Sequence, residues 1–270
     1  MAKGKKRSSP RGRGSRLNIW QSLFFIVVLV AAGYVLLQSP LFSVKDVLVE
    51  GAQALKVDEI QRLSGINPGI NTFKLNLKEV QERVAMNPLV KQVKVKRDYP
   101  GAILIQVEER KAVALLPAQG EYLAVDAEGY YLTRVKDFSK ANLPIITGIR
   151  LGNLTPGKQI AGDGLAAALK FVQKMDQNQL ANLSEVNGAD PLGIVIYTLG
   201  GTEVRLGASE RIEEKLALMR EALKNSYGRK VEYIDITYAG KPVIKFLDTP
   251  ESKAKAGQTA NNNKANDNIH

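Results

Sequence analysis

The pattern of hydrophobic and polar positions divides the chain into one long apolar run, two patterned regions and two polar ends. The apolar run covers residues 19–37, and no charged residue occurs between Leu17 and Val44. A helix of this length spans about 28 Å, roughly the hydrocarbon core of a bilayer. Trp20 and Tyr34 lie near its ends, where amphipathic rings favour the membrane interface. The pattern predicts a transmembrane helix over residues 19–38.

A cleavable signal peptide is the alternative interpretation of the same run. Ala31-Ala32-Gly33 supplies small residues after an apolar stretch, as a cleavage site requires. The apolar run nevertheless continues through Leu37, which makes it longer than the core of a usual signal peptide. We therefore expect an uncleaved single-pass anchor.

Between residues 41 and 111 the apolar positions change period several times. Alternating apolar residues predict strands, and apolar residues three or four apart predict helices. Asn76 and Glu79 have the spacing of a helix cap, and Asn87 before Pro88 marks a helix end. The predicted elements are a strand at 44–49, a helix from Val57 to Gly65, a helix from Asn76 to Asn87, and a hairpin that turns at Tyr99-Pro100-Gly101. Their order is β-α-α-β-β.

Residues 112–248 form a second region that mixes strands and helices. Asp126 to Gly129 is typical of a turn between two strands, and Gly200-Gly201 of a hairpin turn. Ser209 is expected to cap a helix that closes at Gly228. The remaining predicted elements are a short strand within 142–149, a helix through 165–172, a strand at 233–238 and a last strand at 243–247. The predicted fold class is α+β, with a second, mixed α/β domain after the first unit.

Charge is concentrated at the N-terminal end. Residues 1–18 hold seven basic and no acidic side chains, so a net charge of +11 falls to +4 over the remaining 252 residues. A nearly balanced folded region argues against nucleic-acid binding. By the positive-inside rule, the tail at 1–18 is expected in the cytoplasm and everything from Gln38 onward outside. Residues 249–270 are polar and patternless, and we predict that they are disordered.

The composition argues against most catalytic mechanisms. Without cysteine there are no thiolate sites, and the one histidine, His270, ends the polar tail. We therefore expect no metal and no cofactor. Asp126, Glu128 and Asp235 are the remaining catalytic candidates, although turn geometry explains the first two better. A membrane-anchored extracytoplasmic hydrolase that uses two carboxylates is the alternative function, but no known catalytic motif supports it.

The stretch from Asn87 to Arg110 carries a family resemblance. It combines Asn-Pro at a helix end with an Arg-x-x-Pro motif at Arg97 and a Val-x-Glu-Arg motif at Val107. Together these motifs resemble the FtsQ/DivIB family of bacterial cell-division proteins. Extracytoplasmic parts of this family begin with a POTRA domain, a module that holds other protein chains. The resemblance implies a POTRA domain at 41–111 and a β domain at 112–248.

The resemblance also implies a function. Members of the family are bitopic, non-enzymatic scaffolds at the division septum, with the N-terminus in the cytoplasm. They bind small coiled-coil proteins of the DivIC/FtsB and FtsL type and help control wall-synthesising enzymes, with no small-molecule substrate. Thr237 departs from the family, which commonly has an Ile-Asp-Leu-Arg type of motif there.

Other POTRA-containing assembly or chaperone proteins are a further alternative. Outer-membrane assembly proteins carry POTRA modules before a β-barrel of eight or more strands. The second region is too short and too helical to supply such a barrel, so this version of the alternative fails.

The predicted partner site is the C-terminal hairpin. A last strand at 243–247 has one neighbouring strand that is adjacent in the sequence, so an extended partner segment can pair with its other side. Pro242 has no backbone N–H, which is compatible with an edge strand. By motif, Tyr238 and Phe246 match positions that contribute to partner contacts in the family that this chain resembles. The alternative is that both rings belong to the core of the domain. The predicted partner-binding residues are Tyr238, Lys241, Val243, Lys245 and Phe246.

A second candidate surface lies on the hairpin of the first region. Lys94, Lys96 and Arg97, with Lys91 nearby, are predicted to form an outer binding face of the POTRA unit. A merely solvated face is the alternative.

Overall fold

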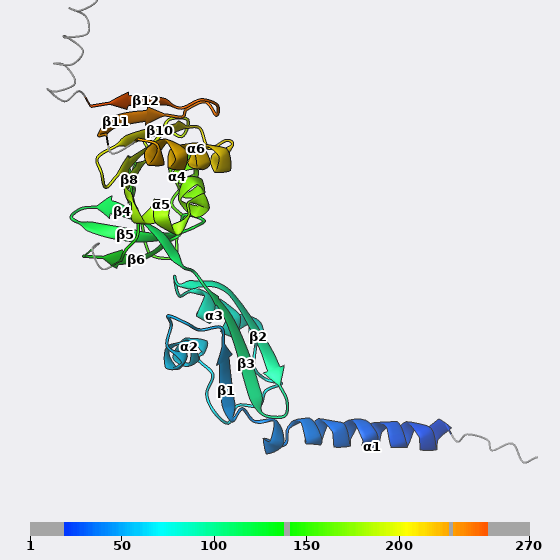
Figure 1. The fold of residues 1–270 in the computed structure, drawn as a ribbon. Helices are drawn as coiled ribbons and strands as arrows, with labels where there is room; N and C mark the ends of the chain where they lie inside the picture. Colours follow the sequence, from blue (N-terminus) through cyan, green and yellow to red (C-terminus); the bar gives the residue numbers. More distant parts are fainter. Residues whose placement is uncertain (1–18, 138–140, 227–228, 248–270) are drawn as a thin grey trace, which may run out of the picture.

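The computed structural model describes residues 19–137, 141–226 and 229–247. An N-terminal helix is followed by a smaller unit built on a three-stranded sheet and a larger unit built on a nine-stranded sheet (Figure 1). The α+β class predicted from the sequence is confirmed. The predictions for the two polar tails, including His270, fall outside the described residues.

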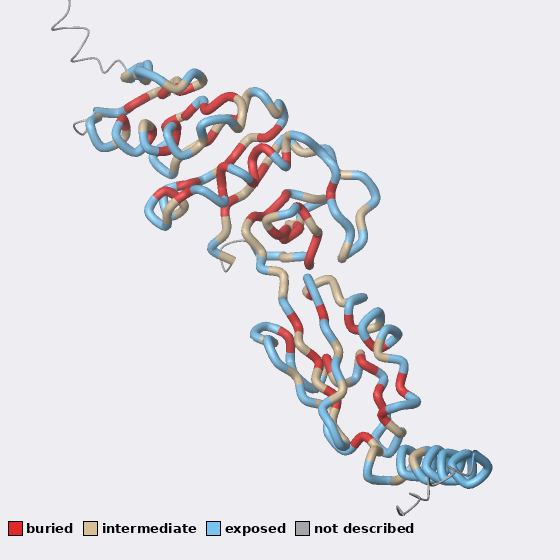
Figure 2. The backbone as a smooth tube through the Cα atoms, turned by 90° about the vertical axis from the view of Figure 1, so that its right-hand side faces the viewer, coloured by how far each residue is buried: buried red, intermediate tan, exposed pale blue. Residues whose placement is uncertain are grey.

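The helix α1 spans Ile19–Leu37 and buries none of its residues (Figure 2). Within the described part of the chain it is the one helix long and apolar enough to cross a membrane. A 3₁₀ turn, η1 at Pro40–Phe42, then leads into the smaller unit, and the Ser39 side chain caps this turn. The apolar run therefore forms one continuous helix, which ends one residue before the predicted position.

The sheet of the smaller unit has the order β1-β3-β2. β1 at Asp46–Glu50 runs parallel to the central strand β3 at Ala102–Glu109. β2 at Val90–Asp98 pairs with β3 in the antiparallel sense, which makes the predicted hairpin. Because β3 lies in the middle, its alternating Ile103 and Ile105 are fully buried.

Two helices cover this sheet, in the predicted β-α-α-β-β order. α2 at Val57–Ser64 ends at Gly65, whose φ of 62° is the left-handed conformation that glycine adopts without strain. α3 at Leu77–Ala85 begins after Asn76, whose side chain accepts the Glu79 N–H at 3.4 Å. The helices contribute Ile60, Val80 and Val84 to the core of the smaller unit, and all three are fully buried. The predicted end of α2 at Gly65 and the predicted start of α3 at Asn76 are confirmed, whereas α3 ends at Ala85, two residues before the predicted Asn87.

The nine-stranded sheet of the larger unit has the order β12-β11-β10-β9-β8-β7-β4-β5-β6. Only two residues separate β3 from β4, so the chain passes directly from one sheet to the other. The strands are β4 Ala112–Ala118, β5 Glu121–Asp126, β6 Tyr131–Val135, β7 Ile145–Thr147, β8 Leu183–Asn187, β9 Ile194–Thr198, β10 Glu203–Gly207, β11 Val231–Asp235 and β12 Val243–Phe246. The sequence did not predict β4 or β8.

Three helices pack on this sheet: α4 at Asp163–Lys174, α5 at Gln177–Ala181 and α6 at Ile212–Lys224. α4 contacts β4 and β9 and lies beside α6, so one hydrophobic core runs through the larger unit (Figure 2). The short helix α5 was not predicted, although its Asp176 and Gln179 form a reciprocal cap.

The predicted Ser209 cap of α6 is wrong. The helix begins at Ile212 after Arg211, a residue at φ 51° that makes no side-chain cap. Its first turn is instead joined to the end of β10 by Lys215, whose buried ammonium donates to the carbonyls of Leu206 and Ala208 at 2.7 and 2.9 Å. The helix ends at Lys224, and the predicted closing Gly228 lies outside the described residues.

The predicted strand at 233–238 also has different bounds. β11 begins two residues earlier and ends at Asp235, whose side chain accepts the Thr237 N–H at 2.9 Å. This local hydrogen bond turns the chain, so Tyr238 leaves the sheet.

Candidate protein-interaction site

The C-terminal hairpin lies at one end of the nine-stranded sheet (Figure 1). β12 pairs with β11 in the antiparallel sense, with Val243 opposite Asp235 and Phe246 opposite Val231. Within the described residues β12 has no second neighbouring strand. The predicted edge position of the last strand is therefore confirmed.

The backbone of β12 alternates between its partner and the open side. The Leu247 N–H donates to the Lys230 carbonyl at 2.9 Å, so it points toward β11. Because successive residues of a strand point their amides in opposite directions, the N–H groups of Ile244 and Phe246 face away from β11. Pro242 falls on the same outward side, where its missing N–H interrupts no ladder hydrogen bond.

The side chains of the hairpin differ in how freely they can contact another molecule. Tyr238 is 87% exposed and Val243 61% exposed, and Lys241 also lies in solvent. Lys245 is exposed but forms an ion pair with Glu232 at 3.0 Å.

Phe246 differs from the other predicted partner-binding residues. Its half-buried ring packs against the hydrophobic core of the larger unit. The Arg229 guanidinium lies 3.7 Å from the ring centroid, in cation–π geometry. The structure thus separates the two predicted aromatic anchors, because only Tyr238 is free of the core.

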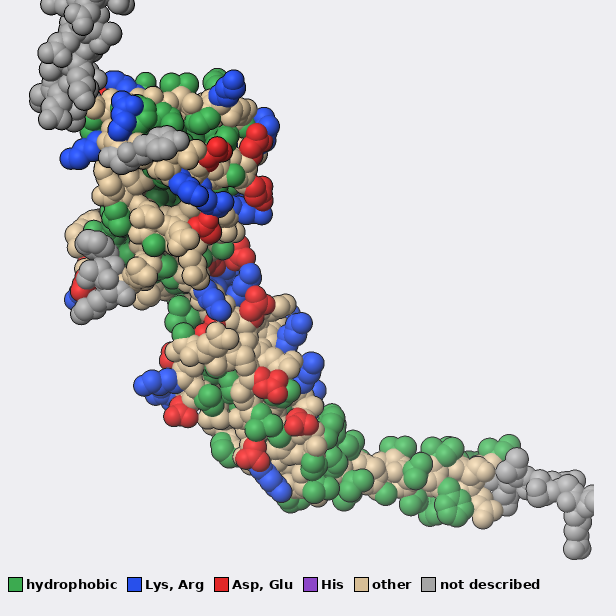
Figure 3. All heavy atoms as spheres, viewed as in Figure 1, with side chains coloured by type: hydrophobic (Ala, Val, Ile, Leu, Met, Phe, Trp, Pro, Cys, Tyr) green, Lys and Arg blue, Asp and Glu red, His purple; other side chains and the backbone are tan. Residues whose placement is uncertain are grey.

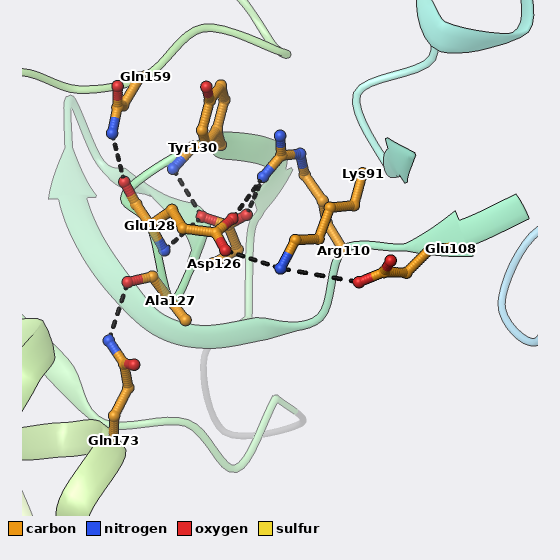
Figure 4. A network of polar contacts seen from close by, with 9 residues as sticks. All are labelled: Lys91, Glu108, Arg110, Asp126, Ala127, Glu128, Tyr130, Gln159 and Gln173. Atoms are coloured by element: carbon orange, nitrogen blue, oxygen red, sulfur yellow. Dashed lines mark hydrogen bonds and ion pairs between the residues drawn. The ribbon is translucent and has the colours of Figure 1, made fainter. Parts of the chain in front are cut away.

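The catalytic candidates do not converge on one site. Asp235 is on β11 and Asp126 on β5, near opposite ends of the sheet. Asp126 and Glu128 lie together at the β5–β6 turn (Figure 4). Asp126 is buried and accepts the backbone N–H groups of Glu128 and Tyr130, at 3.0 and 2.8 Å. The turn therefore explains Asp126, as predicted.

Both carboxylates of this turn are paired with cations from the smaller unit or the short connection after it. The Arg110 guanidinium donates to Asp126 at 2.5 Å and to Glu128 at 2.9 Å, and it stacks over the Tyr130 ring at 3.7 Å. Lys91 of β2 pairs with Glu128 at 2.7 Å (Figure 4). We call Lys91, Arg110, Asp126 and Glu128 the junction cluster.

Within the junction cluster, the contact between Lys91 and Glu128 favours the ionised form of both side chains. The hydrogen bond from Lys91 lowers the pKa of Glu128 below its usual value, against a smaller opposing effect of burial. The hydrogen bond to Glu128 raises the pKa of Lys91 in turn. A general acid would need a carboxyl whose pKa is raised. Glu128 lines an open groove of about 470 Å³, but its pKa is shifted in the opposite direction.

The motifs of residues 87–110 also have structural partners. Arg97 donates to the carbonyls of Thr72 and Leu75 at 2.8 and 3.0 Å. Lys94 and Lys96 remain exposed on β2. Arg97 is therefore committed to holding a loop of the smaller unit, and Lys91 to the junction cluster.

Glu109 has a comparable role that sequence reasoning missed. Its carboxylate accepts the N–H groups of Gln53, Ala54 and Leu55 at 2.8 to 3.0 Å. Burial raises its pKa, but these three hydrogen bonds together outweigh burial and leave the pKa lowered. The Val-x-Glu-Arg motif was the signal: its Glu anchors the loop after β1, and its Arg joins the two units.

The described residues contain no group of three or more carboxylate or histidine side chains placed to hold a metal ion.

Two family models match consecutive parts of the chain. The POTRA domain, FtsQ-type, matches residues 42–110, and the cell division protein FtsQ/DivIB, C-terminal, matches residues 114–237. The second match ends just before Tyr238, so β12 lies beyond it.

Curated relatives cover most of the chain. A cell division protein FtsQ from Syntrophotalea carbinolica is 30% identical over 238 residues, which is 85% of this chain and 83% of the relative. A cell division protein DivIB from Clostridium acetobutylicum is 29% identical over 77% of this chain and 84% of the relative.

Among solved structures, the major extracytoplasmic domain of the trans isomer of DivIB from Geobacillus stearothermophilus is 16% identical to this chain. It covers 46% of this chain and 99% of its own, with a TM-score of 0.31.

Proposed function

The chain belongs to the FtsQ/DivIB family of cell-division proteins, and from that premise we propose that it is a non-enzymatic, single-pass scaffold of the divisome. In this proposal α1 anchors the protein with residues 1–18 in the cytoplasm and both folded units outside, at the septum. The long apolar helix and the seven basic residues before it support this orientation. The proposed domains are a POTRA domain at 41–111 and a β domain at 112–248.

The proposed partners are small coiled-coil division proteins of the DivIC/FtsB and FtsL type. The observation that carries the proposal is the open edge of β12, which pairs only with β11 among the described strands. A strand edge with outward N–H and C=O groups is a template for an extended segment of another chain. Added backbone hydrogen bonds supply affinity, and neighbouring side chains supply specificity.

Tyr238 is the proposed aromatic anchor beside this edge, with Lys241, Val243 and Lys245 around it. An aromatic residue that becomes buried in an interface can contribute roughly 2 kcal/mol or more to binding. Because Tyr238 is 87% exposed, its side chain can be removed at little cost to the fold. Phe246 is proposed to contribute to binding indirectly, because its half-buried ring packs on the core and so supports the edge strand β12.

The test is the affinity of full-length Tyr238→Ala for the extracytoplasmic segment of an FtsB/DivIC-type partner. A loss of 2 kcal/mol corresponds to a Kd about 30-fold weaker than that of the unaltered protein. Leu199→Ala is the matched control, because Leu199 is a similarly exposed apolar residue at the β9–β10 turn of the same domain. Thermal melts check that both variants fold. Wild-type affinity in a folded Tyr238→Ala protein would exclude Tyr238 as the anchor. Wild-type affinity in a folded Phe246→Leu protein as well would exclude the site.

The non-enzymatic part of the proposal has a separate test. The purified protein is incubated with peptidoglycan, and no cleavage is expected. Cleavage that is abolished in the double variant Asp126→Ala, Glu128→Ala would instead establish the carboxylate-dependent hydrolase.

The anchor is tested by N-terminal sequencing of the mature protein. We expect the chain to retain α1. A mature chain that starts near Tyr34 would show signal-peptide cleavage and contradict the single-pass anchor.

A further inference from the structure

An aromatic patch is exposed at the end of the smaller unit where α1 joins it. The Phe73 ring centroid lies 5.3 Å from that of Phe42 and 5.6 Å from that of Tyr99. Tyr99 is 56% exposed, and Leu41 and Ile70 are exposed apolar neighbours in the same segments. Hydrophobic side chains continue from α1 onto the adjoining end of this unit (Figure 3). We call these five residues the basal patch.

The basal patch lies at the C-terminal end of α1. Phe42 follows Leu37 by five residues, in the turn η1. The Asn71 side-chain amide donates to the Leu37 carbonyl at 2.8 Å, so the loop that carries Ile70 and Phe73 is bonded to the last turn of α1. A helix that spans a bilayer ends at the interface between hydrocarbon and headgroups. The basal patch therefore falls at that depth.

Backbone hydrogen bonds hold the patch together from three segments distant in the sequence. The Thr72 N–H donates to the Phe42 carbonyl, and the Lys45 N–H donates to the Gly101 carbonyl, both at 2.8 Å. Arg97 adds its two hydrogen bonds from β2 to the loop around Thr72. The rings therefore project from an ordered base and do not need to be arranged when they meet another surface.

The chemistry of the patch suits the membrane interface. Aromatic side chains concentrate at headgroup level, where the ring leaves water and a polar tip such as the Tyr99 hydroxyl stays hydrated. Lys45 and Lys74 come from the same segments and are exposed, so their ammonium groups can meet anionic headgroups. A water-facing role would leave a cluster of contacting apolar rings unburied.

We propose that the basal patch is a membrane-interface docking site, which seats the POTRA base on the outer leaflet of the bilayer that α1 crosses. The site takes lipid headgroups and upper acyl chains, and it restrains how the extracytoplasmic units tilt from the membrane. The proposal rests on the single span in the proposed function.

The test is fluorescence quenching in vesicles that contain the full-length chain and no other protein. The vesicles are mixtures of phosphatidylcholine and phosphatidylglycerol, with or without bromine on acyl carbons close to the ester groups. Tyr99→Trp and the control Tyr238→Trp are each made in a Trp20→Phe background, because Trp20 is the only native tryptophan. Unaltered Trp20 reports on the span in a separate sample.

We expect brominated lipid to reduce the emission of Trp20 and of the Tyr99→Trp variant, and to leave the Tyr238→Trp variant unchanged. Phe73→Trp gives a second reporter in the patch if Tyr99→Trp does not fold. If Trp20 is quenched and neither patch reporter is, the docking site is wrong and the anchor stands. If Trp20 itself is not quenched, the anchor fails and the docking site fails with it. Because no partner protein is present, quenching at the patch cannot come from one.

Discussion

The two ends of the nine-stranded sheet differ in what covers them. At one end, a returning segment bonds to the first residue of β6: the Tyr131 N–H donates to the Lys158 carbonyl, and the Gly157 N–H donates to the Tyr131 carbonyl, at 2.9 and 2.7 Å. At the other end, no backbone group within the described residues bonds to the outer side of β12. The same sheet therefore has one edge that is protected at its start, which we call the protected end, and one open edge.

The protected end is also the end that meets the smaller unit. The β5–β6 turn carries Asp126 and Glu128, and the junction cluster binds that turn to Arg110 and Lys91 (Figure 4). The open end is the one farthest from α1 in Figure 1. If partner recognition takes place at the open end, as we propose, substitutions at the two ends should affect different measurements.

The largest expected effect is on stability at the protected end. Removing one member of a buried ion pair costs up to about 3–5 kcal/mol. Arg110 would keep Glu128 as its second carboxylate partner, while the N–H groups of Glu128 and Tyr130 would lose their acceptor. We therefore expect Asp126→Ala to lower the free energy of unfolding by up to about 3–5 kcal/mol, measured by denaturant titration. Arg110 is only 11% exposed in this pair, so solvent cannot replace the lost carboxylate.

Glu121→Ala is the control for that change. Glu121 pairs at 3.1 Å with Arg134, which is largely exposed, so its removal should cost less than about 1 kcal/mol. Equal losses in both variants would show that the junction pair does not stabilise the protected end beyond an ordinary surface pair.

The next effect is on partner binding at the open end. Ile244→Pro removes an N–H group that the strand alternation directs outward, while the bonds between β12 and β11 remain. One hydrogen bond is worth about 0.5–1.5 kcal/mol, so affinity for the FtsB/DivIC-type segment should fall by up to roughly tenfold. Ile244→Val keeps the N–H and serves as the control. If Ile244→Pro folds and binds like Ile244→Val, the partner does not add to this edge as a strand.

The smallest effect is the pH dependence of the junction cluster. Because the pKa of Glu128 is lowered in the folded protein, its stabilising contribution is complete above the usual glutamate pKa. That contribution is lost as the pH falls through the lowered value. We expect the stability difference between the wild type and Glu128→Gln to be small at neutral pH, since solvent screens the pair, and to vanish in acid. A difference that persists in acid would mean that Glu128 acts through packing.

The sequence alone predicted the features that depend on local chemistry. Asn76 marks the start of α3 and Gly65 the end of α2, because a side-chain cap and a left-handed glycine each act within one helical turn. The apolar run from Ile19 to Leu37 predicted α1, because nineteen predominantly apolar residues without charge are long enough to cross a bilayer as one helix. The edge position of the last strand followed from its place at the end of the patterned region. The family motifs predicted which kind of protein this is.

Only the tertiary structure decided which residues distant in the sequence become partners. No sequence pattern singled out Lys215, but packing against β10 buries its ammonium and supplies two carbonyl acceptors. Tyr238 and Phe246 looked alike as aromatic anchors, and the turn after Asp235 exposes one while the sheet packs the other on the core. Arg97 looked like a surface cation until Thr72 and Leu75, more than twenty residues away, provided its acceptors. Hydrophobic periodicity reports which face of an element is buried, whereas the identity of the groups across that face depends on how the elements pack.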